Sequence, residues 1–245
     1  MRLLLNDTSA YHNGCKVVID SFEYDESIPT KEPLNKIDWK KYDTVILNGE
    51  GTMHHSAMKA MNLLRALRFA YKAGAKIEIH NTVWQDMVHD YDDVLRRCSK
   101  ITTREVLSHN ELLKHNVVSE IVPDRSILAD VPYKEYPHVE VYQGGYYYKD
   151  QELDEPYPRI DIFTDSWTEI VNRLRHADLL ITGRHHEMYA AIKARCRFIA
   201  VEGNSWKNRG VAETVGVTLP TTVDEALSGE FDDAYRKIFD WAAKR

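Results

Sequence analysis

Arginine and histidine occur together in the last third of the chain, directly after a short apolar segment. Residues 178–181 have the character of a buried strand, Thr182 and Gly183 that of a turn, and the apolar residues beyond recur at helical spacing. Arg184 and His186 are therefore expected at a helix N-terminus, where unpaired N–H groups and the helix dipole favour an anion. A guanidinium matches a carboxylate or phosphate, and an imidazole can transfer a proton near neutral pH. This pattern predicts an anion-binding site with a proton-transfer group.

A glycine-rich turn forms a second candidate site. Residues 45–47 are predicted to form a strand, and a helix is expected over residues 53–71. Between them lie Asn48, Gly49, Glu50, Gly51 and Thr52. Such a turn can present N–H groups to a phosphate or to an acceptor sugar, or it can simply serve the path of the chain. Because Glu50 would repel a phosphate, we assign the turn to the acceptor and Glu50 to general-base catalysis on its hydroxyl.

The first turn of the chain adds a histidine. His12 precedes Asn13 and Gly14, and this turn would face the expected cleft if residues 3–6 form a strand. His12 is therefore a candidate contact for the acceptor, with a surface histidine as the alternative.

The histidines and cysteines show no metal-binding spacing. His54 and His55 are adjacent and would point in different directions on a helix. Cys15, Cys98 and Cys196 lie far apart without a Cys-x-x-Cys pair, which argues against a disulfide framework or a zinc site and favours buried thiols. We expect no metal and no cofactor other than the donor substrate.

Strands and helices alternate along the chain, which is typical of βαβ units with parallel sheets. In the first half, strands are expected at 45–47, 76–80, 101–103 and 118–122, with helices at 53–71 and 105–115. In the second half, strands are expected at 139–142, 160–163, 179–181 and 198–201, with helices at 168–176 and up to 195. The pattern predicts two Rossmann-like lobes.

Prolines and tyrosines interrupt the pattern between residues 130 and 158, where we place the junction of the lobes. The expected division is an N-terminal, acceptor-side lobe over 1–135 and a C-terminal, donor-side lobe over 136–230. Residues 231–245 form an amphipathic helix that is expected to pack back on the first lobe.

Composition indicates an ordinary soluble globular protein. The 245 residues are 43% hydrophobic and 29% charged, and no segment is apolar for long enough to span a membrane. The start of the chain lacks the apolar core of a signal peptide, so a cytoplasmic location is expected. The net charge of −6 gives no overall attraction to nucleic acid, although a local basic groove is compatible with it.

Several short motifs follow one another in an order seen in a known family. The turn 48–52 is similar to its glycine-rich turn, with Glu50 at a position where that family usually has glycine. Arg104, between Thr103 and Glu105, is similar to its Ser-x-Arg element at a helix start, although a salt bridge to Glu105 or Glu111 is the alternative. The chain in these respects resembles the polysaccharide pyruvyl transferases.

The second half carries further matches to the same family. Pro123-Asp124 is similar to the pair that closes the first lobe, and Arg184-His185-His186 is similar to the family's Arg-x-His element. Lys207, after the strand at 198–201, matches a lysine that follows that element by some twenty residues. The resemblance implies two facing Rossmann-like lobes of the glycosyltransferase B type.

The resemblance also implies a transferase that uses phosphoenolpyruvate to form a ketal on a sugar. Arg184, Arg104, Lys207 and Gly183 would then bind the anionic donor, and His186 would act as general acid or base. The same fold serves nucleotide-sugar glycosyltransferases, so a nucleotide sugar is an equal candidate for the donor. Two alternatives are a glycosyltransferase that modifies a hydroxylated base in DNA, for instance of a phage, and a non-catalytic module that binds nucleotides or glycans.

Overall fold

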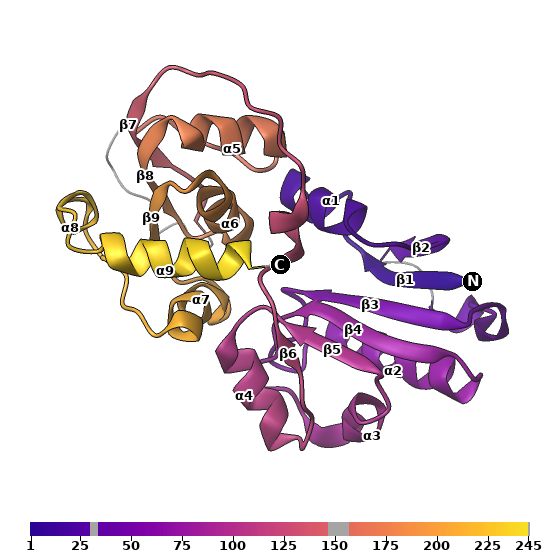
Figure 1. Ribbon diagram of the computed structural model, residues 1–245. Coiled ribbons are helices and arrows are strands. Elements are labelled where there is room, and N and C mark those ends of the chain that lie inside the picture. Colours follow the sequence, from indigo (N-terminus) through magenta and orange to yellow (C-terminus); the bar gives the residue numbers. More distant parts are fainter. Residues whose placement is uncertain (30–33, 147–156, 245) are drawn as a thin grey trace. The chain divides into compact units, whose positions relative to one another are not determined.

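The computed structural model describes residues 1–29, 34–146 and 157–244, and these form two compact units (Figure 1). Unit 1 consists of Met1–Thr8 and Phe22–Val122, and unit 2 of Ser9–Ser21 and Pro123–Arg245. The first segment of unit 2 lies inside the expected N-terminal lobe, so the division differs from the one read along the sequence. Within the described ranges, no helix has the length and apolar character to cross a bilayer.

Unit 1 contains a six-stranded, all-parallel sheet. Its strands are β1 (Arg2–Asp7), β2 (Glu26–Pro29), β3 (Thr44–Glu50), β4 (Lys76–Thr82), β5 (Lys100–Thr103) and β6 (Glu120–Ile121), in the order β2-β1-β3-β4-β5-β6. The next strand along the chain, β2, pairs on one side of β1. The strands from β3 onward extend the sheet on the other side of β1. The carboxyl ends of β1 and β3 thus flank the topological switch point, which is where open α/β sheets bind ligands.

The helices of unit 1 bury one face of this sheet. They are α2 (Met58–Lys72), α3 (Asp92–Leu95) and α4 (Val106–Lys114), with short 3-10 turns η1 (Leu34–Lys36), η2 (Trp39–Lys41) and η3 (His89–Tyr91). Leu63, Leu64 and Leu67 of α2 share a core with Val45 and Ile77, at alternating strand positions. Figure 1 shows α2, α3 and α4 on the same side of the sheet. An apolar stripe at helical spacing and alternating strand residues account for this layer.

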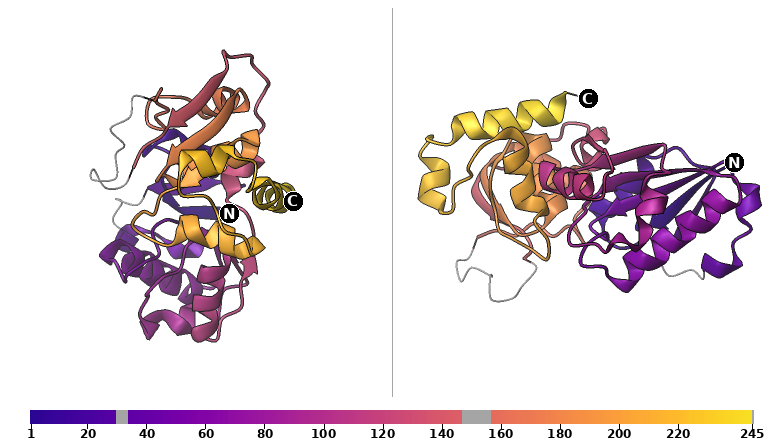
Figure 2. Two further views of the ribbon diagram at one scale, coloured as in Figure 1. Left: turned by 90° about the vertical axis from the view of Figure 1, so that its left-hand side faces the viewer. Right: turned by 90° about the horizontal axis from the view of Figure 1, so that it is seen from below.

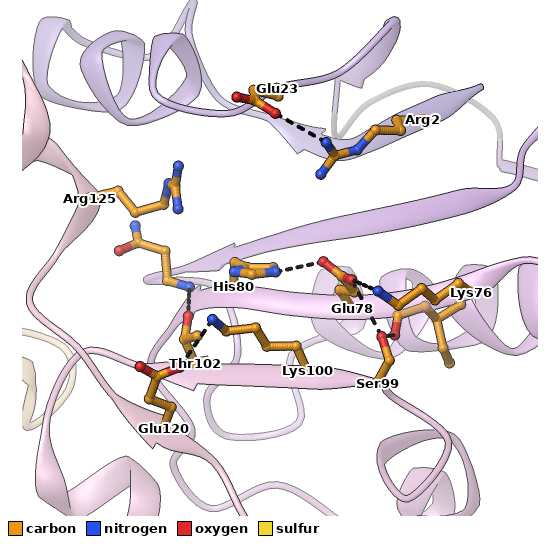
Figure 3. Close-up of polar contacts among 12 residues, drawn as sticks. Arg2, Glu23, Lys76, Glu78, His80, Ser99, Lys100, Thr102, Glu120 and Arg125 are labelled. Atoms are coloured by element: carbon orange, nitrogen blue, oxygen red, sulfur yellow. Dashed lines mark hydrogen bonds and ion pairs between the residues drawn. The ribbon is translucent and has the colours of Figure 1, made fainter.

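The opposite face of β4 carries charged residues (Figure 3). Glu78 lies between Lys76, at 2.7 Å, and the Nε2 atom of His80, at 2.9 Å. Burial alone would raise the pKa of Glu78, but the hydrogen bonds from Lys76 and His80 outweigh it and lower this pKa to about 2. Lys100 and Glu120 link β5 to β6 in the same way, at 3.1 Å. On this face of the sheet, each of these charged side chains therefore has a partner of opposite charge on the same strand or on the neighbouring one.

Unit 2 contains a three-stranded parallel sheet in the order β7-β8-β9. The strands are β7 (Val139–Gln143), β8 (Ala177–Thr182) and β9 (Arg197–Ala200), and the helices are α1 (Asn13–Asp20), η4 (Arg125–Leu128), α5 (Trp167–Arg175), α6 (His185–Ala194), α7 (Lys207–Val215), α8 (Val223–Leu227) and α9 (Asp232–Ala243). Residues 160–163 were expected to form a strand, but the pairing is limited to an isolated bridge between Gln143 and Arg159, and residues 162–164 form a turn. The strand does not continue because the Asp161 carbonyl oxygen accepts from the N–H groups of Thr164 and Asp165, at 3.1 and 2.8 Å, which closes the chain into this turn.

The last helix packs within unit 2, which corrects the expectation that it packs on the first lobe. Tyr235, Ile238 and Ala242 of α9 join the core around Met188 and Phe198. The Tyr235 hydroxyl donates to the Phe198 carbonyl oxygen at 2.8 Å. Figures 1 and 2 both show the yellow helix along the orange ones of this unit. A three-stranded sheet leaves α6 and α7 with an apolar flank, and the amphipathic face of α9 covers it.

Candidate functional site

The glycine-rich turn lies at the switch point of unit 1, between the ends of β1 and β3. The Asn6 side-chain amide donates to the carbonyl oxygen of Asn48 at 2.6 Å and to the hydroxyl of Thr52 at 3.4 Å. The Thr8 hydroxyl donates to the Glu50 carboxylate at 2.7 Å. Polar side chains at the end of β1 thus hold the turn, and place Glu50 where a ligand of this sheet would bind.

Glu50 occupies a backbone conformation that favours glycine. Its φ is 43°, and Asn6 and Asn81, at the ends of β1 and β4, have φ values of 64° and 56°. A side chain in this left-handed region costs about 1–2 kcal/mol. The neighbouring Gly49 has no room for a side chain, since a Cβ there would overlap the Thr82 side chain. Such backbone strain is common at functional sites.

The turn does not open a helix, contrary to the expectation that one begins at residue 53. Helix α2 starts at Met58, and its N-cap residue Ala57 forms no side-chain cap. The N–H group of Thr52 donates to the Gly49 carbonyl oxygen at 3.0 Å, and that of His55 to Gln85 at 2.8 Å. The residues beyond the turn pair with the segment that follows β4, and the helix starts only after this pairing. Gly51 and Thr52 therefore do not present a helix N-terminus to a phosphate, and the acceptor assignment rests on side chains such as Asn48 and Glu50.

Arg104 follows β5 at the same edge of the unit 1 sheet. Its N–H group donates to the Thr82 carbonyl oxygen at 3.2 Å, and its side chain is buried. The adjacent Glu105 is the N-cap of α4, with its carboxylate accepting from the Ser108 N–H at 3.0 Å. Burial is the main cause that raises the pKa of Glu105, and the charge of Arg104 opposes it. Arg104 is thus at a strand end and a helix start, as expected, and its contact with a donor stays a prediction.

Arg184 is fixed at the start of α6 in unit 2. It is the N-cap residue, and its N–H group donates to the Thr182 hydroxyl at 2.9 Å. Its guanidinium lies over the Phe163 ring, 4.7 Å from the centroid. Gly145, just after β7, lets it pass, because a Cβ there would overlap the Arg184 side chain. Stacking on Phe163 and close packing against Gly145 hold the guanidinium at the carboxyl edge of the sheet, and Arg184 stays partly exposed to solvent.

His186 lies in the first turn of α6 beside a buried carboxylate. Its Nε2 atom is 3.7 Å from Oδ2 of Asp124, and Nε2 of His185 is 3.8 Å from the same oxygen. Asp124 is fully buried and accepts from the Ser126 N–H at 2.9 Å. The structure thus gives Asp124, noted in the sequence as part of a Pro-Asp pair, a place next to the proposed proton-transfer group.

His12 belongs to the same unit and lies next to His186, with ring centroids 5.1 Å apart. It is the N-cap of α1, and its Nδ1 atom accepts from the Cys15 N–H at 3.1 Å. Burial lowers the pKa of His12 to about 3, and the charges of His186 and Arg184 add to this. His12 is therefore neutral and lies beside His186, and its contact with the acceptor stays a prediction.

His12, Cys15 and His186 place possible metal ligands within 4.8 Å of one another. Nε2 of His12 is 3.4 Å from the Cys15 sulfur. In the neutral ring, however, Nδ1 already accepts a hydrogen bond, so Nε2 carries the proton and faces the sulfur. Metal binding through Nε2 would require His12 to lose its helix cap. The local geometry favours a hydrogen-bonded pair over a metal site.

Glu187 is a site residue that the sequence analysis missed. It is fully buried, and its Oε2 accepts from the Gly145 N–H at 2.8 Å and from the Thr182 hydroxyl at 2.6 Å. Oε1 accepts from the Ile162 N–H at 3.4 Å. Burial raises the pKa of Glu187 to about 7, although these hydrogen bonds and Arg184 oppose it. One carboxylate thus joins the ends of β7 and β8 to the turn before α5, behind Arg184.

Known structures resemble this fold, although no family model and no curated sequence matches the chain. A functionally uncharacterised protein from Klebsiella pneumoniae gives a TM-score of 0.60 at 13% identity, covering 90% of this chain and 93% of its own. A protein from Listeria monocytogenes described as a UDP-N-acetylglucosamine 2-epimerase gives 0.55 at 9% identity, covering 100% and 90%. UDP-GlcNAc 2-epimerase from Neisseria meningitidis, bound to UDP-GlcNAc, gives 0.52 at 10% identity, covering 97% and 94%. These likenesses confirm the expected fold, two Rossmann-like units of the glycosyltransferase B-like type.

Asn208 is a second residue without a signal in the sequence. Its side-chain amide donates to the Gly183 carbonyl oxygen at 3.3 Å and to that of Val201 at 2.9 Å, and its Oδ1 is 3.2 Å from Nδ1 of His185. It clamps the start of α7 to the turn between β8 and α6. Lys207, expected to contact the donor, is the first residue of α7, and its ammonium donates to the Asn204 side chain at 2.7 Å. The clamp was missed because no helix was expected in the place of α7.

Proposed function

We propose that the protein is a transferase that holds an anionic, activated donor at the carboxyl edge of the unit 2 sheet. The observation that carries this proposal is the arrangement of Arg184 and His186 on the first residues of α6, with Asp124 beside the imidazole. The N-terminus of α6 and the guanidinium both favour a phosphate or carboxylate. His186 adds a group that can exchange a proton.

These residues suit the transfer of a pyruvyl or glycosyl group to a sugar hydroxyl. With a nucleotide sugar, the acceptor oxygen forms a bond to the anomeric carbon, and the bond from that carbon to the donor phosphate breaks. With phosphoenolpyruvate, a first sugar hydroxyl adds to C2 while C3 takes up a proton, and a second hydroxyl then displaces the phosphate from C2 to close the ketal. The phosphate leaves with the electron pair, and Arg184, with Lys207, stabilises its charge. His186 transfers the proton, either from the acceptor hydroxyl or to the departing phosphate. Glu50, held by Thr8 at the switch point of unit 1, is the second candidate base.

Two classes of donor fit this chemistry. A nucleotide sugar is supported by the fold, because the Neisseria meningitidis enzyme of similar fold was solved with UDP-GlcNAc. Phosphoenolpyruvate is supported by the order of Arg184, His186 and Lys207, which resembles the pyruvyl transferases. Both donors carry phosphate, so both would use the Arg184 fork.

Ligand-dependent thermal stability separates these donors. The purified chain is heated with UDP-GlcNAc, UDP, phosphoenolpyruvate or inorganic phosphate, and the melting temperature is followed. A true ligand at a hundredfold excess over its Kd adds about 2.7 kcal/mol to the free energy of unfolding. The Arg184→Ala variant should lose this gain. Arg236→Ala, which removes an exposed arginine of α9 paired with Asp233, should retain it. No gain with any donor, or an equal gain in both variants, would contradict the proposed site.

A further inference from the structure

A second group of histidines and an aspartate lies in unit 1, apart from every residue assigned above. The Nδ1 atom of His89 is 2.9 Å from Oδ2 of Asp92, and Nδ1 of His115 is 2.6 Å from Oδ1 of the same carboxylate. The two imidazole rings stack with centroids 4.1 Å apart and planes 28° apart. Three elements meet here, because His89 begins η3, Asp92 begins α3 and His115 is the C-cap of α4.

The three donor atoms have the spacing that a small divalent ion needs. They lie within 4.8 Å of one another. Zinc binds imidazole nitrogen and carboxylate oxygen at about 2.0–2.2 Å, so that ligand atoms around a tetrahedral ion are about 3.4 Å apart. In the metal-free arrangement the two Nδ1 hydrogens point at the carboxylate. An ion placed between the three groups replaces these hydrogens, and small ring shifts complete its coordination.

The surroundings supply both a rigid side and an open side. His115 is 2% exposed, and its ring lies edge-on to Trp84 with centroids 6.0 Å apart. His89 is 68% exposed, so an ion can enter from solvent past this ring and keep a water as its fourth ligand. The Nη1 atom of Arg96, a half-exposed residue, lies 3.8 Å from Oδ2 of Asp92 and donates to the His115 carbonyl oxygen at 3.3 Å, so the ion competes with Arg96 for this carboxylate oxygen.

This group differs from His12, Cys15 and His186 in its hydrogen bonds. In that group, Nδ1 of His12 accepts the hydrogen bond that caps α1, and this bond competes with metal binding through Nε2. Here, each histidine uses Nδ1 toward Asp92, and the same atom is the ligand. Loss of the Nδ1 proton therefore leaves the helix caps of this region unchanged.

We propose that His89, Asp92 and His115 bind a zinc-like divalent ion. Imidazole and carboxylate ligands suit the borderline ions of the zinc and cobalt type. The ion would link η3 and α3 to the end of α4 in unit 1.

Cobalt absorption provides the test in the full-length chain. Co²⁺ is titrated into the protein, its visible d–d absorption is recorded, and Zn²⁺ is then added to displace it. The wild type should show a saturable band at one ion per chain. His89→Gln, which changes an exposed side chain and leaves the fold intact, should weaken Co²⁺ binding by at least about tenfold. His55→Gln is the matched control, since His55 is also exposed and lies 3.1 Å from one carboxylate, that of Asp86.

The outcomes decide the proposal. Absence of a saturable band in the wild type overturns it, as does equal binding by the wild type and His89→Gln. A near-ultraviolet thiolate band that disappears in Cys15→Ser would move the ion to His12, Cys15 and His186, and would also overturn it. Zn²⁺ should raise the melting temperature of the wild type and of His55→Gln, and fail to raise that of His89→Gln.

Discussion

Arg184 and His186 are neighbours on one helix turn, but their chemistry predicts different kinetic effects. A guanidinium binds the donor anion in the ground state, whereas a proton-transferring imidazole acts in the transition state. We expect Arg184→Ala to raise the KM for the donor strongly. His186→Ala should chiefly lower kcat, by about 10² to 10⁴. Lys207→Ala should resemble the arginine change more mildly, because an ammonium lacks the fork.

Steady-state kinetics with the donor identified by thermal stabilisation measure these effects. Rescue of His186→Ala by added imidazole would support a proton-transfer role. Full turnover by His186→Ala would remove His186 as the catalytic residue and leave Glu50 as the candidate base.

Glu187 predicts a specific dependence of stability on pH. Its pKa is raised from 4.5 to about 7 in the folded protein, so folding favours the protonated form. The resulting stability is fully present below about pH 4.5 and is lost as the pH rises through 7. For a shift of this size, we expect the wild type to lose up to about 3 kcal/mol between pH 4.5 and 8 relative to Glu187→Gln.

Urea unfolding of both proteins across this pH range measures the difference, which cancels the other titrating groups. A difference between the two proteins that stays the same across this pH range would contradict the prediction, because it would mean that folding leaves the pKa of Glu187 unchanged. A difference that grows in favour of the wild type at high pH would mean that folding lowers this pKa, and would contradict it too.

At the scale of elements, the sequence predicted the strands and their carboxyl ends better than the connections between them. The apolar residues of β3, β4 and β8 indicate strands without reference to the rest of the chain. Arg184 and Glu50 were singled out because each lies at the end of such a strand or just beyond it. Glu187 was missed because its role depends on Gly145 and Thr182, which only the fold brings together. The start of α2 was misplaced because its delay depends on a bridge to Gln85.

Gly145, two residues after β7, should affect donor binding through Arg184. A Cβ at Gly145 overlaps the Arg184 side chain, which is partly exposed and can yield. We therefore expect Gly145→Ala to weaken donor binding by displacing the guanidinium, with a small effect on folding. A double-mutant cycle checks the cause, because the effect of Gly145→Ala on donor affinity should disappear in the Arg184→Ala background. An undiminished effect in that background would place its cause elsewhere in the loop.

The end of β3 allows a separation of stability from function. Glu50→Gly relieves a φ of 43° but removes the hydrogen bond from Thr8. We expect its free energy of unfolding to change by less than about 1 kcal/mol, since relief of strain of about 1–2 kcal/mol offsets the lost bond and the added chain entropy. Turnover should fall sharply if Glu50 acts as the base. Unchanged turnover would make this side chain a structural feature of the turn.

At the scale of the whole molecule, the chain leaves and re-enters each unit. Helix α1 is separated from the rest of unit 2 by the whole of residues 22–122, yet it completes the surroundings of His186. The Asn13 N–H donates to the Ile162 carbonyl oxygen at 3.1 Å, and its side-chain amide donates to that of Asp165 at 2.8 Å. Gly14 lies against the His186 side chain, and a Cβ there would overlap it. A linear division of the sequence cannot show this exchange.

A fragment experiment follows from that exchange. Residues 123–245 expressed alone lack α1, so the turn at Ile162 loses a hydrogen-bond partner and the His186 ring loses its cover. We expect this fragment to bind the donor at least about tenfold more weakly than the full chain, which corresponds to about 1.4 kcal/mol. Fusion of residues 9–21 to it through a flexible linker should restore the affinity, because it returns α1 to the fragment. The same fusion with His12→Ala, which removes the cap of α1, should restore less. If residues 123–245 alone bound the donor as tightly as the full chain, α1 would have no part in the donor site, and His12 would be a structural cap with no influence on His186.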